Sequence, residues 1–358
     1  MRIAQVAPLD EAVPPLFYGG TERIVAYLCD ALVDMGHEVT LFASAESRTR
    51  AKLVRMRDQA IRLDKTTLKS HLAAHLAMMH EVRRRQHEFD VLHFHTDVIH
   101  FPLFEDIADR TLTTLHGRLD LKDLRNILMR WPDYPLASIS DSQRAPLPHA
   151  NWAATVHHGL PMKRFRFSPA SHGGYLAFLG RVSPEKGPIR AIEIARAAGI
   201  PLKIAAKVDP HDEAYYHRCV EPLLADPLID FIGEIGDTDK SDFLGNALAL
   251  LFPIDWPEPF GLVMIESMAS GTPVIAFNCG AVPEIVDDGV TGFVVNSSEE
   301  ALAAIGRVKL LNRLRIRHIC ERRFSAASMA KRYLDVYARL VGGSAFEHER
   351  RGAGISAV

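Results

Sequence analysis

The alternation of short apolar runs with amphipathic helical segments constrains the fold of this chain more than any other feature of its sequence. Residues 2–8 form an apolar run, and residues 21–35 repeat apolar side chains at helical spacing. Gly36 then predicts a helix stop before the apolar residues 38–43. Further strand-like runs lie at 90–95, 111–116, 136–140 and 154–158. Because these runs are almost continuously apolar, we predict a parallel sheet with helices on both faces.

A second alternation begins after residues 159–174, a segment rich in proline, phenylalanine and glycine that interrupts the pattern like a linker. Strand-like and helical segments then follow in turn, at 175–180, 188–199, 201–208, 211–224, 229–233, 239–245, 247–253, 260–270 and 273–277. Strands that alternate with helices in both halves predict an α/β protein with two Rossmann-like doubly wound domains. A chain of 358 residues is also long enough for two hydrophobic cores.

These patterns set the predicted domain boundaries. The first domain is expected to cover residues 1–165 and the second residues 166–325. An amphipathic helix over 326–341 is expected to pack back on the first domain, and the polar, glycine-containing residues 342–358 to form a loose tail.

Composition and charge exclude several classes of protein. The formal net charge is −2, so the overall charge does not indicate a nucleic-acid-binding protein. The four cysteines are scattered, without a CxxC pair or metal-like spacing, so we predict neither a disulfide framework nor a zinc site. The first residues lack the long apolar stretch of a secretory signal, and no apolar run is long enough to span a bilayer. A cytoplasmic protein is expected, with peripheral contact to the inner face of a membrane as an alternative.

Two glycine-containing turns are candidates for binding an anion. Gly19 and Gly20 are expected between the first strand and the first helix, where backbone N–H groups would face an anion, although a plain turn is an equal alternative. Arg181 and Lys186 lie just after the strand at 175–180, and a guanidinium with an ammonium suits a diphosphate. The alternative is two solvated surface cations.

Two glutamates frame the third candidate segment. Pro257 and Pro259 keep Glu258 out of a helix, so the helix is expected to begin near Phe260 or Gly261. Glu266 then lies on this helix, while the free N–H groups of its first residues would stabilise an anion. Carboxylates beside an anion are costly unless they accept hydrogen bonds from hydroxyls. We therefore interpret Glu258 and Glu266 as ligands of two sugars that flank a diphosphate, with a loop charge and a solvated helix residue as the alternatives.

The chain resembles the retaining nucleotide-sugar glycosyltransferases of family 4, which have the GT-B fold. The most specific resemblance is the E-x7-E motif at 258–266, and residues 268–295 continue in a similar way. The segments YGGTERIV, TLHG and GRVSPEKG also resemble the glycine loop, active-site histidine and phosphate segment of that family, at 18–25, 114–117 and 180–187.

The resemblance implies roles for individual residues. Arg181 and Lys186 would hold the donor diphosphate, Glu266 the ribose hydroxyls and Glu258 hydroxyls of the transferred sugar, while His116 would face the anomeric centre. The implied donor-binding set is Gly19, Gly20, Arg181, Lys186, Glu258, Phe260, Gly261, Leu262 and Glu266. The implied catalytic set is His116, Glu258, Arg181 and Lys186.

The implied reaction transfers a hexose from a nucleotide-diphosphate sugar, with UDP-glucose as the first choice, to an acceptor hydroxyl with retention and without a metal or other cofactor. The acceptor would be a glycan, a lipid-linked saccharide or a small molecule, in polysaccharide or glycoconjugate biosynthesis, and it would bind the loops at 10–18 and 118–125. Three alternatives stay open: a sugar-nucleotide epimerase or hydrolase on the same fold, a glycosidase that uses Glu258 and Glu266, and a non-catalytic sugar-nucleotide-binding protein.

Two other polar segments resemble metal sites or polar strand faces. Asp237-Thr238-Asp239 matches a DxD metal motif, but Asp239 is interpreted as a helix N-cap. His93 and His95 face one side of a strand and are interpreted as polar residues near a sheet edge or pocket, with His95 closer to the active site.

The basic run at 307–323 predicts a solvated face, or a surface for anionic lipid. His158 and Lys207 stand where many members of the resembled family have Asn and Gly, which leaves the nucleotide base and the hinge open.

Overall fold

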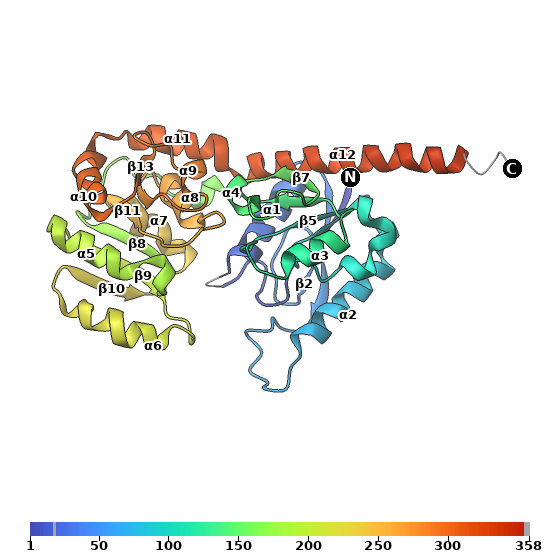
Figure 1. Ribbon diagram of the computed structural model, residues 1–358, viewed down its shortest axis with the longest axis horizontal. Coiled ribbons are helices and arrows are strands. Elements are labelled where there is room, and N and C mark those ends of the chain that lie inside the picture. Colours follow the sequence, from blue (N-terminus) through green and yellow to red (C-terminus); the bar gives the residue numbers. More distant parts are fainter. Residues whose placement is uncertain (17–18, 354–358) are drawn as a thin grey trace. The chain divides into compact units, whose positions relative to one another are not determined.

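The computed structural model of the chain describes residues 1–16 and 19–353, with side chains as far as Gly342 (Figure 1). It divides into two compact units, Met1–Gly159 with Ala326–Val358, and Leu160–Ser325. The first boundary lies at 159/160 instead of the expected 165/166. The reason is that Leu160 donates its N–H to the carbonyl of Phe324 at 2.8 Å and forms a parallel bridge with Ser325, which ties the segment after Gly159 to the second unit.

The sheet of the first unit has seven parallel strands in the order β3-β2-β1-β4-β5-β6-β7. Their bounds are β1 Arg2–Val6, β2 Glu38–Ser44, β3 Lys52–Arg57, β4 Val91–Phe94, β5 Thr111–Thr114, β6 Leu136–Ser138 and β7 Trp152–Thr155. The order reverses between β1 and β4, which is the switch point where doubly wound sheets bind ligands. The predicted strands are all present, but β3 was not predicted because its alternating charged residues hide a strand at the sheet edge.

The helices of the first unit are α1 Gly20–Asp34, α2 His71–Arg84, α3 Leu124–Arg130, α4 Asp141–Arg144 and α12 Ala326–Ala353. The long helix α12 packs against α1 and β4 (Figure 1). α12 continues through residues expected to be a loose tail, so that expectation is wrong as far as Ala353, while residues 354–358 lie outside the described residues. The two glycines at 342–343 cost a helix only about 1 kcal/mol each, and the alanine, glutamate and arginine residues that follow favour it.

The second unit has a six-stranded parallel sheet in the order β10-β9-β8-β11-β12-β13. The strands are β8 Leu176–Arg181, β9 Leu202–Lys207, β10 Ile229–Gly233, β11 Ala249–Phe252, β12 Val274–Phe277 and β13 Gly292–Val295. Two parallel doubly wound sheets confirm the predicted fold class.

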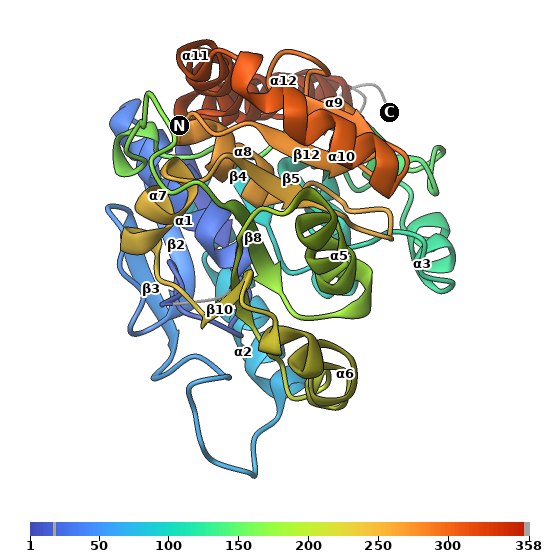
Figure 2. The same cartoon turned by 90° about the vertical axis from the view of Figure 1, so that its left-hand side faces the viewer.

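Helices cover both faces of this second sheet. The α-helices are α5 Pro188–Ala198, α6 Glu213–Tyr215, α7 Asp237–Gly245, α8 Leu262–Ala269, α9 Val282–Ile285, α10 Ser298–Arg307 and α11 Arg313–Phe324. α5 and α10 pack together on one face, where alternate side chains of β8 to β13 complete the core, whereas α8 packs on the other side against α7 and α11 (Figure 2).

Two local predictions differ from the structure. The helix expected at 211–224 is a series of short segments, with α6 followed by a π-helical turn at Tyr216–Val220 and a 3-10 turn at Glu221–Ala225, where Pro222 cannot continue an α-helix. Asp239 is not an N-cap, because α7 begins earlier, at Asp237, and Gly236 takes the cap position.

Candidate functional site

The carboxyl end of β8 positions the two predicted phosphate ligands. Arg181 is the last residue of β8, and Lys186 ends a 3-10 turn at Pro184–Lys186. Gly187 follows with φ of 70° and opens α5. A Cβ at Gly187 would lie 2.1 Å from the carbonyl oxygen of Pro253, so only glycine allows the turn to pack this closely on the loop after β11.

Arg181 is surrounded by carboxylates. Its guanidinium lies 2.6 Å from Glu185, 3.6 Å from Asp209 and 3.7 Å from Asp212. Burial opposes ionisation of Glu185, but hydrogen bonds from its own backbone, from Ser183 and from Arg181 together lower the pKa of this carboxyl. The Arg181 guanidinium is therefore compensated by three carboxylates.

Lys186 and Glu258 form the clearest polar pair of the candidate site. The Lys186 ammonium makes an ion pair with Oε2 of Glu258, and the Trp256 indole donates to the same oxygen at 3.0 Å. The ammonium also lies 4.9 Å from the centre of the Trp256 ring, a cation–π distance. The two side chains are only 17% and 11% exposed, so the pair is largely shielded from solvent. The structure therefore brings together two residues that lie 72 positions apart in the sequence.

The loop that carries Glu258 is braced by a second glycine. Gly280 has φ of 58°, and a Cβ there would lie 2.3 Å from the backbone nitrogen of Glu258. The N–H of Ala281 donates to the Glu258 carbonyl at 2.9 Å. This close approach fixes the backbone that positions the Glu258 carboxylate.

The helix α8 begins where the sequence predicts. Gly261 is its N-cap with φ of 82°, Leu262 is its first residue, and Phe260 is buried just before it. The first N–H groups of a helix have no intrahelical carbonyl partner, and the helix dipole is positive at this end. The start of α8 thus offers N–H donors to an anion.

Glu266 has a lysine partner that sequence reasoning missed. Its carboxylate is 2% exposed and lies 2.8 Å from the Lys240 ammonium, which comes from α7. Lys240 also lies 3.4 Å from Asp237. No spacing rule links a lysine on α7 to a glutamate on α8, so only the packing of these helices reveals the pair.

His116 lies in the first unit, two residues after the end of β5. Its Nε2 is 2.9 Å from Nδ1 of His95, and its ring stacks on His158 with centroids 5.3 Å apart. Within the described part of the chain, Nδ1 of His116 is buried and has no hydrogen-bond partner. Burial lowers the pKa of His116 to about 3, so this imidazole is neutral near pH 7.

His93 is buried on β4 and His95 is buried just after it; because β4 is an interior strand and not a sheet edge, that part of their interpretation is wrong. His95 hydrogen bonds to His116, which is the histidine that the sequence analysis expects in the active site.

The predicted glycine loop is partly a helix. Gly19 is the N-cap of α1, whereas Gly20 is its first residue and not part of the turn. Glu22 lies in the first turn and is 6% exposed, and burial raises its pKa to about 7. Tyr18 lies outside the described residues.

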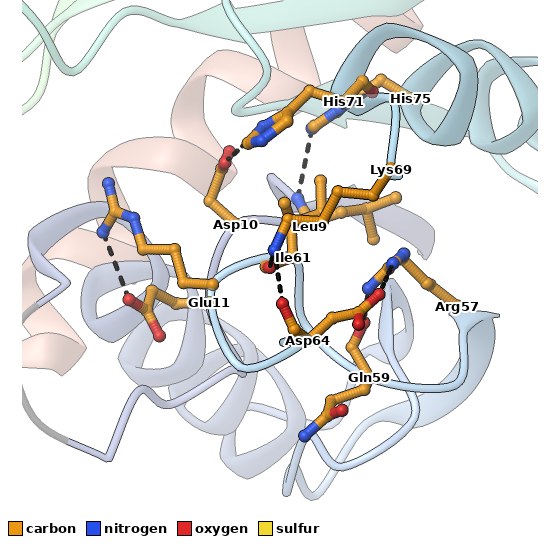
Figure 3. A network of polar contacts seen from close by, with 11 residues as sticks. Leu9, Asp10, Glu11, Arg57, Gln59, Ile61, Asp64, Lys69, His71 and His75 are labelled. Atoms are coloured by element: carbon orange, nitrogen blue, oxygen red, sulfur yellow. Dashed lines mark hydrogen bonds and ion pairs between the residues drawn. The ribbon is translucent and has the colours of Figure 1, made fainter. Parts of the chain in front are cut away.

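The loop at 10–16, expected to bind the acceptor, is held by the segment at 57–75 (Figure 3). Asp10 lies 3.3 Å from His71, Glu11 lies 3.2 Å from Arg62, and the N–H of Leu9 donates to His75 at 3.2 Å. This network orders the start of the loop, but it does not identify an acceptor.

The basic run at 307–323 is not a uniformly solvated face. The Arg313 guanidinium donates to the carbonyls of Ser168, Gly245 and Ala247, and burial lowers its pKa to about 10. Arg317 is 9% exposed and donates to carbonyls of Met162, Phe165 and Ala269. These two arginines satisfy buried carbonyls, which corrects the expectation that the run presents them to solvent or lipid.

Comparisons with known families and structures cover most of the chain. Residues 18–141 match the family model "Glycosyltransferase Family 4", and residues 163–321 match "Glycosyl transferases group 1". AviGT4, a glycosyltransferase involved in avilamycin A biosynthesis, superposes with a TM-score of 0.72 at 24% identity, over 96% of this chain and 98% of that chain. The chain has the GT-B fold of glycosyltransferases.

Other matches agree on this fold. Sucrose-phosphate synthase from Thermosynechococcus elongatus superposes with a TM-score of 0.77 at 18% identity, over 96% of this chain and 100% of that chain. The D-inositol 3-phosphate glycosyltransferase of Mycobacterium tuberculosis is 30% identical over 197 residues, which is 50% of this chain and 40% of that protein. The chain therefore matches less than half the length of this curated relative.

In the part of the chain that the structure describes, no group of three His, Cys, Asp or Glu side chains is arranged to hold a metal ion. Among the same residues, no helix combines the length and the apolar character required to cross a bilayer.

Proposed function

We propose that this protein is a retaining glycosyltransferase that moves a hexose from a nucleotide-diphosphate sugar to an acceptor hydroxyl. The single observation that carries the proposal is the Lys186–Glu258 pair beside the N-terminus of α8, in a chain whose two halves match glycosyltransferase family models. An ammonium, a buried carboxylate and helix N–H groups are the chemistry that a sugar joined to a diphosphate requires.

The donor is proposed to exchange partners with the Lys186–Glu258 pair. Lys186 would turn to a phosphate oxygen, and Glu258 would accept hydrogen bonds from hydroxyls of the sugar. Arg181 would add a second cation once the diphosphate replaces Glu185, Asp209 or Asp212. Phe260, Gly261 and Leu262 are proposed to present backbone N–H groups, and the turn at Gly19 and Gly20 would complete the donor site.

Glu266 is proposed to bind the ribose hydroxyls. Its carboxylate lies 2.8 Å from the Lys240 ammonium, so a cation compensates its charge inside the protein. A second oxygen then remains available to accept hydroxyl hydrogen bonds.

The proposed chemistry needs no protein nucleophile, metal or other cofactor. The cations and the N-terminus of α8 would stabilise the charge that develops on the leaving diphosphate, which is the dominant kind of catalytic contribution in such sites. The acceptor would attack from the side of the leaving group, whose phosphate oxygen takes the acceptor proton. This order of events retains the anomeric configuration.

UDP-glucose is the proposed donor. The support is indirect: HepE from Anabaena, which superposes with a TM-score of 0.72 at 17% identity over 94% of this chain and 99% of that chain, has been crystallised with UDP-glucose. The acceptor is proposed to be a glycan, a lipid-linked saccharide or a small molecule, and a cytoplasmic location with peripheral membrane contact would suit the second of these.

Donor hydrolysis and transfer assays test this function. The protein is incubated with UDP-glucose and other nucleotide sugars, with and without simple saccharide and inositol acceptors, and with and without EDTA. We expect slow release of nucleoside diphosphate alone and faster release with an acceptor, independent of EDTA, with an α-linked product from an α-linked donor. An altered sugar nucleotide formed without acceptor would instead indicate an epimerase, and binding without any turnover would indicate a non-catalytic protein.

A further inference from the structure

A buried polar network in the first unit ends at His116, the histidine that the sequence analysis expects to face the anomeric centre. It joins His116 to the C-terminal helix α12 through side chains of β1, β4 and β5. Its members are Gln5, His93, His95, Thr114, His116, Tyr333 and Tyr337. All of them except His116 are fully buried or nearly so, which means that their hydrogen bonds must be satisfied by one another.

The contacts of the network form one unbranched chain. Nε2 of His116 lies 2.9 Å from Nδ1 of His95, and Nε2 of His95 lies 2.8 Å from Oε1 of Gln5. Nε2 of Gln5 lies 3.0 Å from the hydroxyl of Tyr337, which lies 2.7 Å from Nδ1 of His93. The opposite nitrogen of His93 lies 2.7 Å from Oγ1 of Thr114.

The Gln5 amide sets the direction of the two hydrogen bonds that lead from it through His95 to His116. Its Oε1 can only accept, so Nε2 of His95 must carry the hydrogen. Neutral His95 then has a bare Nδ1, which must accept from Nε2–H of His116. Neutral His116 is left with a bare Nδ1, the buried atom without a partner among the described residues.

Rotation of the Gln5 amide by 180° would reverse the two bonds that join Gln5, His95 and His116. Nε2 of Gln5 would then donate to His95, His95 would donate to His116, and Nδ1 of His116 would carry a hydrogen. The two arrangements use the same atoms at the same distances, and they differ in whether His116 offers a lone pair or an N–H group. The tautomer of His116 therefore depends on the orientation of the Gln5 amide, whose Nε2 donates to the Tyr337 hydroxyl.

We propose that Gln5, His95 and Tyr337 are positioning residues that fix His116 as its Nε2–H tautomer, so that Nδ1 accepts a hydrogen bond from a hydroxyl of the transferred sugar. A hydroxyl would satisfy the buried Nδ1. This inference rests on the proposed function for the sugar, but the tautomer itself is a property of the protein alone and can be measured without a substrate.

Helix α12 supplies a matched pair of variants for the test. Tyr337 and Tyr333 are both fully buried one helical turn apart on α12, and their rings pack with centroids 6.2 Å apart. Tyr337 contacts Gln5 and His93, whereas Tyr333 hydrogen bonds to Thr114 at 3.0 Å, at the far end of the chain. Tyr337→Phe removes the acceptor that orients the Gln5 amide, and Tyr333→Phe removes an equal hydroxyl without touching Gln5.

The experiment is long-range ¹H–¹⁵N NMR on protein with ¹⁵N-labelled histidine, in which His116→Asn assigns the signals of His116. In the wild-type protein and in Tyr333→Phe we expect Nδ1 of His116 to be unprotonated. In Tyr337→Phe a population with Nδ1 protonated should appear, because Gln5 can rotate. We also expect kcat of donor turnover to fall about 10-fold in Tyr337→Phe, as for loss of one hydrogen bond, with an unchanged Kd for UDP.

Two outcomes would overturn the inference. One is a protonated Nδ1 in the wild-type protein, and the other is the same His116 tautomer and the same kcat in Tyr337→Phe and Tyr333→Phe. If Tyr337→Phe does not fold, Gln5→Met provides the same comparison from β1. Failure to observe any turnover would contradict the proposed function and leave the NMR result intact, so the two failures are distinguishable.

Discussion

At the residue scale, the candidate site is a set of charges that compensate one another. Lys186 pairs with Glu258, and Lys240 pairs with Glu266, so each of the two motif glutamates has its own lysine. Breaking a buried or partly buried ion pair costs more than the pair contributes, because one charge is left without compensation. The consequences can be measured for each residue.

Lys240→Met should reveal the cost of leaving Glu266 without a cation. We expect a loss of roughly 3 kcal/mol in the free energy of unfolding, since Glu266 is 2% exposed. Urea denaturation measures it. The double variant with Glu266→Gln should recover most of the loss, and Lys203→Met, whose side chain is 40% exposed, is the control. A loss that Glu266→Gln does not relieve would contradict this account.

Glu22→Gln should change stability in a pH-dependent way. The pKa of Glu22 is raised to about 7, so the folded protein binds a proton more tightly than the unfolded chain. Stability is therefore lost as pH rises from about 4.5 to 7, and the variant avoids this loss. We expect the free energy of unfolding of Glu22→Gln to exceed that of the wild type by about 2–3 kcal/mol at pH 8, with little difference at pH 4.5. The same difference at both pH values would exclude this cause.

At the element scale, glycines at the ends of strands and helices place the site. Gly187 and Gly280 let the loops after β8, β11 and β12 pack closely, and Gly261 opens α8. This packing holds Lys186 and Glu258 in one place.

Gly280→Ala should disturb the site more than its backbone strain alone explains. The new Cβ would meet the backbone of Glu258, whereas Gly289 has a similar φ of 70° and open space around it. Gly289→Ala should therefore lower the free energy of unfolding only by the cost of the left-handed conformation, about 1 kcal/mol. We expect Gly280→Ala to lower the melting temperature further and to weaken UDP binding, which Gly289→Ala should not do. Equal effects of the two substitutions would show that the close approach does not matter.

The sequence predicted elements better than it predicted partners. Most strands of the two sheets and the start of α8 followed from apolar periodicity and glycine positions, whereas the edge strand β3 did not. Lys240 and the network of Gln5 were missed because they depend on which helices and strands pack together, which local patterns do not contain. Arg313 and Arg317 were misinterpreted for the same reason, since the sequence of a basic run does not show which backbone carbonyls its guanidinium groups will hydrogen bond.

At the scale of the whole molecule, the two units differ in their buried histidines. Burial lowers the pKa of a group of histidines in the first unit: His93, His95, His100, His116 and His158. Because these imidazoles are neutral in the folded state, they resist protonation that the unfolded chain accepts. The first unit should therefore depend on pH more than the second.

Acidification should destabilise the first unit selectively. Below pH 6.5 the unfolded chain binds more protons than the folded chain, so stability falls as pH falls, by up to about 1.4 kcal/mol per histidine for each pH unit. Hydrogen exchange read by mass spectrometry, corrected for intrinsic rates, should show β4 and β5 losing protection between pH 7.5 and 5.5, while β8 and β11 change less. Equal losses in the two sheets would contradict this prediction.

The central claim is that the second unit binds a nucleoside diphosphate through Lys186. Isothermal titration of UDP, followed by ADP and GDP, into wild-type protein, Lys186→Ala and Lys203→Ala tests it most directly. Lys203 lies near the amino end of β9, away from the carboxyl ends where Arg181 and Lys186 lie. The account predicts that Lys186→Ala weakens binding at least about 10-fold, as expected for a charge-assisted hydrogen bond, while Lys203→Ala leaves it unchanged. Equal affinity of all three proteins for the nucleotide that binds best, or no binding of any of them, would contradict it.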